Sequence, residues 1–436
     1  MKKLLVALLS LGLIVAFSMS ASAATVKFSG LYYVAGAYED NRSLGDTGKS
    51  VSLADFWTRT RIKSDFNIAE GLTFTTQFDA LEKRWGGTNW RGDYDDLSYS
   101  RPAAAKGTAN AQENFEFEHA YVTFKTALGM FNVGYQAAGV WGTVFADTPY
   151  SYARIKYTVP VGPVTLLAVY EKTYETVSST ANSGVTDGDT DNYYLAGIGN
   201  FKGGNAGLLF KFVNARPVRA SLGYKAEAFG LVPYFKATFG PVYVEGEAVY
   251  LFGKTKKYDT AALGKDVDAA GWGGYVLAKM NFGPAFVGGQ IGFSSGDDTT
   301  TTDKDESGPK SSTSWVPALI FTDANYKTWI GGSNPGGFDA SAKQNLLLYN
   351  VFAGFNVTPK FVIETALTGM QADKTDAGVD KNYGYELDVS ATYKIYDNLS
   401  YMVGAGYLWT GDYFKGAKNA TIGNDYAILN KLTLNF

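Results

Sequence analysis

The chain has 436 residues and a formal net charge of −3 at pH 7, and this slight acidic excess argues against nucleic acid as a partner. It contains no cysteine and one histidine, His119, which excludes disulfide frameworks, thiolate metal sites and multi-histidine metal centres. No cofactor is therefore expected.

Residues 1–23 have the three parts of a secretory signal peptide. Lys2 and Lys3 precede an apolar run at 4–17, and small residues follow at 21–23. The apolar run is shorter than the roughly 20 residues that a membrane-spanning helix needs. Cleavage after residue 23 is expected. Without those two lysines, the remaining chain keeps 37 of the 39 basic residues against 42 acidic ones.

The stretch FWTRTRIKSDF, residues 56–66, alternates between two kinds of side chain. Arg59, Arg61 and Lys63 fall on one face, whereas the other face is mainly aromatic and β-branched. The sequence therefore predicts a strand with a ladder of positive charge on one side. On a lipid-facing surface each of these cations costs roughly 2 to 4 kcal/mol at the bilayer midplane, so we expect the ladder to face water.

Alternating segments of this kind recur along the whole chain, which is rich in tyrosine (30) and phenylalanine (28). Turn signals separate them, and long helical periodicity is absent. The 18 expected strands span 25–39, 53–69, 71–85, 115–127, 130–137, 151–160, 163–176, 192–201, 205–213, 229–239, 241–252, 271–282, 284–295, 344–357, 360–371, 382–396, 399–411 and 424–436.

The connections between these strands alternate between short turns and long polar loops. Residues 70–71 and 397–398 form tight turns, whereas 86–114 and 296–343 are long. This alternation predicts an all-β, transmembrane, antiparallel up-and-down barrel of about 18 strands that occupies residues 24–436. We interpret 214–228 as a loop. If it forms a hairpin, or if a short strand is dropped, the count changes by two, and 16 strands is the alternative.

A soluble β-sandwich, with the charges on its solvated faces, is the competing interpretation. A sandwich protein of this length needs more than one domain, and no linker or change of composition divides the chain.

The energetic argument that turns the ladder inward also applies to other charged residues. The expected inward cations are Lys125, Arg154, Lys156, Lys211, Lys236 and Lys279. The expected inward carboxylates are Glu245, Glu247, Glu364, Glu386 and Asp388. Carboxylates two residues apart on a strand are interpreted as a hydrated wall rather than as a glycosidase pair. No Gly-x-Ser-x-Gly elbow, phosphate-binding loop or His-Glu-x-x-His site occurs, so no enzymatic activity is expected.

The long loop 296–343 contains two different kinds of sequence. The acidic run 294–307 does not have the spacing of a calcium-binding loop and is interpreted as solvated. The segment SWVPALIFTDANYKTWIGG, 314–332, is apolar and aromatic. We expect it to pack over or into the barrel mouth, where it would confer a preference for particular solutes.

The final strand, YAILNKLTLNF, keeps Tyr426, Ile428, Leu432, Leu434 and Phe436 on one face. It resembles the terminal strand of Gram-negative outer-membrane barrels. Two further blocks resemble strands two to five of the general, trimeric-type porins. These blocks are WTRTRIKSDFNIAEGLTFTTQFDALEK (57–83) and HAYVTFKTALGMFNVGYQ (119–136).

The resemblance implies that Arg59, Arg61 and Lys63 form the basic ladder of a porin lumen. It also implies that 137–150 is a constriction loop folded into the pore, although Asp147 is its only carboxylate where typical constriction loops carry several. An ordinary surface loop is the alternative for this segment.

As partners, the resemblance implies outer-membrane lipid, the barrel-assembly machinery that reads the strand ending in Phe436, and two further copies in a homotrimer. The function that it implies is passive diffusion of small polar solutes and ions through the outer membrane. A substrate-selective uptake channel and a structural or adhesive barrel are the alternatives.

Overall fold

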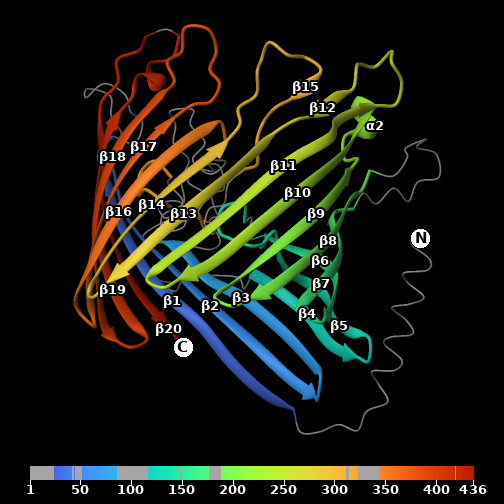
Figure 1. Ribbon diagram of the computed structural model, residues 1–436, viewed down its shortest axis with the longest axis horizontal. Coiled ribbons are helices and arrows are strands. Elements are labelled where there is room, and N and C mark those ends of the chain that lie inside the picture. Colours follow the sequence, from blue (N-terminus) through green and yellow to red (C-terminus); the bar gives the residue numbers. More distant parts are fainter. Residues whose placement is uncertain are drawn as a thin grey trace, which may run out of the picture.

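Eighteen long strands form one ring in the computed structural model (Figure 1). The structure describes residues 24–41, 44, 52–85, 116–147, 150–175, 188–310, 314–322, 344–417 and 419–436. The signal peptide predicted at 1–23 lies outside the described residues.

The strands of the ring, in chain order, are β1 (Thr25–Glu39), β2 (Leu53–Ala69), β3 (Leu72–Arg84), β4 (Glu116–Thr126), β5 (Gly129–Ala138), β6 (Tyr150–Val161), β7 (Val164–Tyr174), β8 (Thr190–Phe201), β9 (Gly204–Ala215), β10 (Tyr224–Phe239), β11 (Val242–Tyr258), β13 (Trp272–Phe282), β14 (Ala285–Ser294), β16 (Leu346–Thr358), β17 (Phe361–Gln371), β18 (Asn382–Tyr396), β19 (Leu399–Thr410) and β20 (Asp425–Asn435).

Pairing between the first and last strands closes the ring. Each strand pairs antiparallel with the next, and β1 pairs with β20 from Leu31 opposite Asn435 to Glu39 opposite Ala427. At the very end of the chain, Gly30 and Phe436 exchange two backbone hydrogen bonds of 2.7 and 3.0 Å. The ring therefore has no unpaired edge there, and the predicted 18-stranded antiparallel barrel is confirmed.

Short turns join the strands at one end of the barrel and longer connections join them at the other, as expected. We call these the turn end and the loop end. At the loop end, β12 (Val267–Ala269) pairs with β11 and with β15 (Lys304–Asp305). The remaining short elements are α2 (Arg219–Leu222) and η2 (Asp412–Lys415). In the part of the chain that the structure describes, no helix is long and apolar enough to span a membrane.

The loop expected at 214–228 is shorter in the structure. Strand β9 continues to Ala215 and β10 begins at Tyr224, while β11 extends to Tyr258, beyond its expected end at 252. Polar sequence led us to predict loops there. A cross-strand ion pair stabilises the longer strands, since the Nζ atom of Lys257 on β11 lies 2.6 Å from Oε2 of Glu227 on β10.

The outer face of the barrel is apolar, as a lipid-facing surface requires. On β20, for example, Ile428 is 48% exposed whereas the next residue, Leu429, points inward and is 0% exposed. Aliphatic and aromatic side chains such as Leu367, Tyr385 and Val403 are exposed on other strands.

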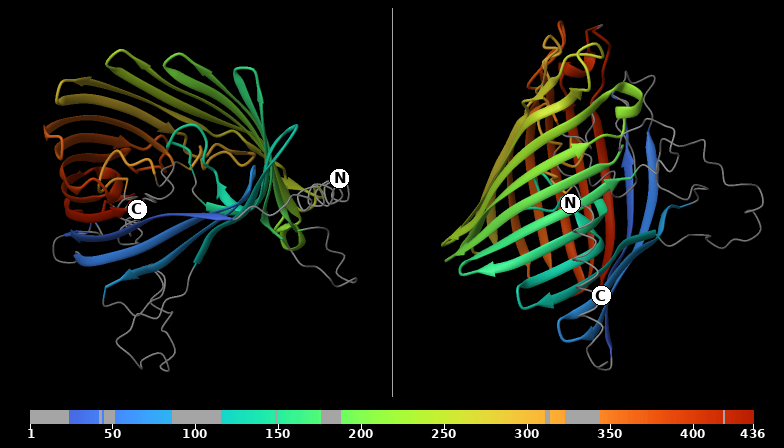
Figure 2. Two further views of the ribbon diagram at one scale, coloured as in Figure 1. Left: turned by 90° about the horizontal axis from the view of Figure 1, so that it is seen from below. Right: turned by 90° about the vertical axis from the view of Figure 1, so that its right-hand side faces the viewer.

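Part of the barrel interior is filled by a hydrophobic core. Two segments that follow strands at the loop end turn into the ring, which the left view of Figure 2 shows from below. We call residues 139–147 the inner loop and residues 314–322 the cross segment. Their buried side chains pack with inward residues of β1, β13, β16, β17, β19 and β20, among them Leu348, Met370 and Leu429.

Candidate channel lumen

The inner loop is held against the opposite wall by a carboxylate of β11. Glu247 accepts hydrogen bonds from the backbone N–H of Thr143, at 2.8 Å, and from its hydroxyl, at 2.7 Å. The same hydroxyl accepts the N–H of Phe145 at 3.1 Å. Hydrogen bonds to a charged carboxylate are among the stronger ones in proteins, so this contact fixes the loop inside the ring.

An aromatic side chain fixes the beginning of the inner loop. Trp141 donates its indole N–H to the carbonyl of Val232 on β10 at 2.9 Å and packs edge-on against Tyr234, with ring centroids 5.2 Å apart. Gly142 has a φ of +63°, and an added Cβ would lie 2.6 Å from the Tyr234 ring. Only glycine fits this position without displacing the tyrosine.

Asp147, the single carboxylate of the predicted constriction loop, accepts the backbone N–H of Trp141 at 2.8 Å. It therefore closes the inner loop on itself. Burial raises the pKa of Asp147 to about 6, against the opposing effects of that N–H and of the Lys236 charge. This side chain is consequently charged only above a mildly acidic pH.

The cross segment is held by carboxylates of β18. Glu386 accepts the backbone N–H groups of Ile320 and Phe321, each at 2.6 Å, and Asp388 accepts that of Leu319 at 3.3 Å. Three successive peptide N–H groups thus point at two neighbouring carboxylates, which is a favourable arrangement for negative charge.

An aromatic cluster joins the inner loop to the cross segment. The ring of Phe145 stacks on Tyr275 of β13, at 5.1 Å between centroids, and meets Trp315 edge-on at 5.0 Å. All three side chains are almost completely buried. The two inserted segments therefore form one packed unit across the lumen, rather than two separate loops.

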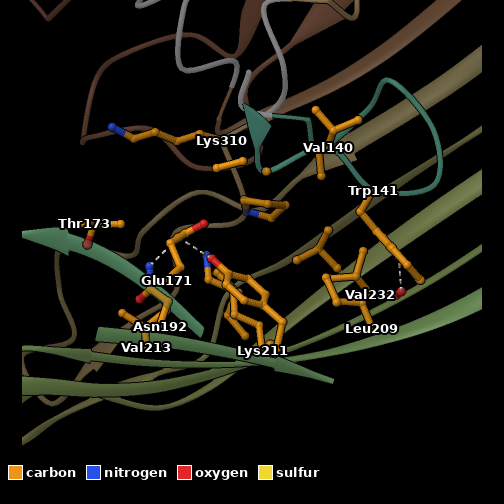
Figure 3. Close-up of a pocket in the computed structure, with 18 of the residues that line it drawn as sticks. Val140, Trp141, Glu171, Thr173, Asn192, Leu209, Lys211, Val213, Val232 and Lys310 are labelled. Atoms are coloured by element: carbon orange, nitrogen blue, oxygen red, sulfur yellow. Dashed lines mark hydrogen bonds between the residues drawn. The ribbon is translucent and has the colours of Figure 1, made fainter. Parts of the chain in front are cut away.

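An open space lies on the other side of that unit. A cavity of about 900 Å³ extends between the inner loop and the inner faces of β6 to β11. Figure 3 shows Glu171 within it, with hydrogen bonds to neighbouring side chains, and Trp141 reaching over Val232. We call this space the main cavity.

The main cavity has a polar wall built around one carboxylate. Glu171 accepts hydrogen bonds from Asn192 and Tyr194, both at 2.8 Å, and pairs with the Arg154 guanidinium at 3.0 Å. Arg154 is thereby neutralised. Lys156 and Lys211 also line the cavity, and within the described ranges neither makes an ion pair with a carboxylate. Glu171 also attracts the Lys211 charge, so Arg154, Lys156 and Lys211 present three cations to a single carboxylate on this wall.

The basic ladder predicted on β2 is paired with carboxylates. Arg61 makes a two-pronged contact with Asp79 of β3, with both N–O distances 2.6 Å, and Arg59 lies 3.6 Å from the same carboxylate. Lys63 lies 3.4 Å from Asp65. None of the three basic residues lines the main cavity.

We expect the replacement of Arg59, Arg61 and Lys63 by glutamine to shift the reversal potential in a salt gradient toward cation preference. The shift should grow as ionic strength falls, because exposed charges are screened over roughly 10 Å at 0.1 M salt. It should stay smaller than the shift produced by changing charges in the main cavity. Planar-bilayer recording measures it, and the charge-neutral variant R61Q/D79N is the matched control that should not shift. An equal shift in that control would contradict an electrostatic origin.

The remaining predicted lumen residues have separate environments. Lys125 is exposed at the turn end beside Gly71. Glu245 accepts the hydroxyl of Tyr243 at 2.6 Å and that of Tyr275. These contacts orient Glu245 beneath the aromatic cluster.

The expectation of hydrated carboxylates on the late strands differs from the structure. Glu247, Glu386 and Asp388 are only 4%, 0% and 7% exposed, because the inner loop and cross segment cover them. The sequence shows the carboxylates but not the peptide N–H groups that they bind.

Several interior residues were not singled out from the sequence. Asp79 pairs with the ladder, Glu171 organises the main cavity, and Lys431 lies over the Tyr33 ring at 4.3 Å. The period-two pattern could have found Asp79 and Lys431, since each falls on the face opposite to large apolar residues of its strand, Phe74 and Phe78 for the first and Ile428 and Leu432 for the second.

No family model and no curated protein matches the sequence. Among solved structures, the chain is similar to Pseudomonas aeruginosa OccK8 (OprE), with 12% identity, a TM-score of 0.55 and coverage of 94% of this chain and 98% of that chain. Pseudomonas aeruginosa OpdK with vanillate has 11% identity and a TM-score of 0.54, with coverage of 94% of this chain and 98% of that chain. Pseudomonas aeruginosa OccK9 (OpdG) has 13% identity and a TM-score of 0.53, with coverage of 94% of this chain and 99% of that chain. At this level of identity the similarity shows the barrel fold.

Proposed function

We propose that the protein is an outer-membrane porin, a water-filled channel for passive diffusion of small hydrophilic solutes and ions. The observation that carries this proposal is a closed barrel with an apolar outer face, charged inward residues and a cavity of about 900 Å³ beside the inserted segments.

The turn end then faces the periplasm and the loop end faces the exterior, because both termini of such barrels lie on the periplasmic side. The position of the first and last strands supports this, since β1 begins and β20 ends at the turn end, where Gly30 and Phe436 exchange backbone hydrogen bonds.

We infer that export depends on cleavage of residues 1–23, and that the barrel-assembly machinery recognises the final strand ending in Phe436. We also infer a homotrimer, as the resemblance to general porins implies. Chemical crosslinking in native membranes tests the oligomer. Only monomers after crosslinking would remove this inference and leave the channel itself untouched.

The decisive measurement is the conductance of the purified protein in a planar lipid bilayer. We expect discrete steps of ohmic current at neutral pH, and faster swelling of proteoliposomes in small sugars than in large ones. A structural or adhesive barrel with a filled lumen would pass almost no current. Absence of steps from folded, heat-modifiable protein would therefore reject the proposal.

A second candidate function is selective uptake of amphipathic anions. The features that favour it are Lys156 and Lys211 on the same cavity wall as the aromatic rings of Tyr152 and Tyr194 and the apolar side chain of Leu209. Lys211 lies 5.8 Å from the centroid of the Tyr194 ring. Block of the current by an aromatic carboxylate at concentrations where acetate has no effect would favour this selective channel over a general porin.

A further inference from the structure

The cross segment divides the lumen on the side opposite the main cavity. Besides the β18 carboxylates, Gln290 of β14 accepts the indole N–H of Trp315 at 2.8 Å. Asn350 of β16 donates to the carbonyl of Pro317 at 3.1 Å. The segment is thus tied to three strands of one half of the ring, through both its donors and its acceptors.

Below the cross segment lies a second cavity of about 410 Å³, which we call the lower cavity. Residues 316–319 form its boundary toward the loop end. Glu364, Thr392 and Met402 line its other end, and each lies within a few residues of a turn between strands. The lower cavity therefore extends from the middle of the lumen toward the turn end and is closed above by the cross segment.

Both hydrogen bonds and packing hold the cross segment over the lower cavity. Ala318, Ile320 and Phe321 are buried among inward apolar residues of β16 to β20. The peptide N–H groups of residues 319–321 are satisfied by Glu386 and Asp388 rather than by a neighbouring strand. Removing these acceptors leaves buried donors without partners, which is costly even where the packing stays intact.

We infer that Glu386 and Asp388 are positioning residues that hold the cross segment as a partition, and that this partition closes a second passage whose periplasmic half is the lower cavity. The inference rests on the proposed channel function. It assigns the size limit of the channel to the position of the cross segment, which two buried carboxylates hold, rather than to the inner loop alone.

We call Glu386 and Asp388 the latch. The charged groups around the latch are consistent with a fixed position of the cross segment. Glu386 and Asp388 face each other as well as the three N–H groups, and Glu364 is the other carboxylate that lines the lower cavity. Lys279, on β13, lies over the Phe286 ring at 3.8 Å rather than pairing with either member of the latch. Among the described residues, the latch is therefore held by three peptide N–H groups and by a side-chain hydrogen bond between the two carboxyl groups.

The absence of cysteine from the chain allows a direct test of the partition. Ala318 is 2% exposed, so in an otherwise unchanged protein the variant A318C should react slowly with a membrane-impermeant maleimide. Adding E386Q and D388N should raise the labelling rate by about tenfold. The N–H groups of Ile320 and Phe321 each use a different oxygen of Glu386, and the glutamine amide keeps one acceptor oxygen and places an NH2 donor at the other position. The channel formed by E386Q/D388N should also show a single-channel conductance roughly twice that of the parent, since two open passages conduct in parallel.

The matched control is D425N. Asp425 is also a buried carboxylate of a barrel strand that accepts a loop N–H, from Asn41 at 2.8 Å, but it holds a different loop. This variant should change neither the labelling of A318C nor the conductance. If E386Q/D388N fails to assemble, the variant I320S/F321S loosens the packing of the cross segment instead and should give the same two increases.

The outcomes separate the inference from the proposed function. Unchanged labelling in E386Q/D388N overturns the latch. Faster labelling with unchanged conductance shows that the segment is held there but closes no passage, which overturns the partition. If the parent protein conducts no current at all, the proposed function fails, and faster labelling without any current in the variant overturns the second passage as well.

Discussion

Replacing Lys156 and Lys211 together by glutamine is expected to turn the channel toward cations. Both side chains line the main cavity, and within the described residues neither forms an ion pair, although Glu171 attracts the Lys211 charge. In a tenfold gradient of KCl we expect the reversal potential to move by about 10 to 20 mV, out of the ~59 mV that an ideally selective channel develops. The change should be larger at low ionic strength, because salt screens the remaining charges.

The control for this experiment is the pair R154Q/E171Q. Arg154 and Glu171 neutralise each other at 3.0 Å in the same wall, so their joint removal leaves the net charge of the cavity unchanged. It should shift the reversal potential little, although it replaces two charged side chains of the cavity by neutral ones. A shift of the same size in both double variants would show that cavity shape, and not the charge of the two lysines, sets the selectivity.

Replacing Phe436 by aspartate is expected to reduce the amount of assembled, heat-modifiable protein in the outer membrane by about tenfold or more, for which a loss of only about 1.4 kcal/mol suffices. The aromatic ring lies over Gly30, where an added Cβ would approach it to 2.6 Å, and the residue ends the strand that closes the ring. A charge here faces lipid and alters the side chain by which the assembly machinery is expected to recognise the strand. Heat-modifiability on a gel measures the yield.

Phe239→Asp is the matched control for that variant. Phe239 is 64% exposed at the end of β10, next to a tight turn, so it presents a comparable ring at the same end of the barrel without ending the chain. We expect this variant to assemble far better than F436D. Refolding of purified F436D into detergent should be closer to normal than assembly in cells, and equal losses in both would point to barrel stability instead of recognition.

The strands were predictable from sequence because the two faces of the barrel wall contact different surroundings. Period-two alternation located β2, with cations on one face, and the turn signals located its neighbours. Prediction was weakest at the loop end, where polar residues led us to end β9 and β11 too early and to begin β10 too late. Strand β16 was placed within two residues of its bounds, although its inward Leu346 and Leu348 are as apolar as its outward Tyr349 and Val351, because the cross segment covers the inner face.

The candidate site was predictable in its residue types and not in its contacts. The sequence placed Glu247, Glu386 and Asp388 on inward positions, but their partners are backbone N–H groups of distant loops. The sequence separation ranges from 65 residues, between Phe321 and Glu386, to 104 residues, between Thr143 and Glu247. Such partners have no signature in composition or spacing. The apolar character of 314–332 was a usable signal: its described part, 314–322, does enter the barrel, whereas 323–332 lies outside the described residues.

The hydrophobic core inside the ring also determines where an applied voltage falls. Packed apolar side chains carry no ionic current, so the voltage across the membrane is dropped along the water-filled side next to β6 to β11. One elementary charge that crosses the full voltage changes its energy by about 2.3 kcal/mol per 100 mV. Because Lys156 and Lys211 line this side, the ions that carry the current pass both ammonium groups, and the two lysines act on every ion that crosses the barrel.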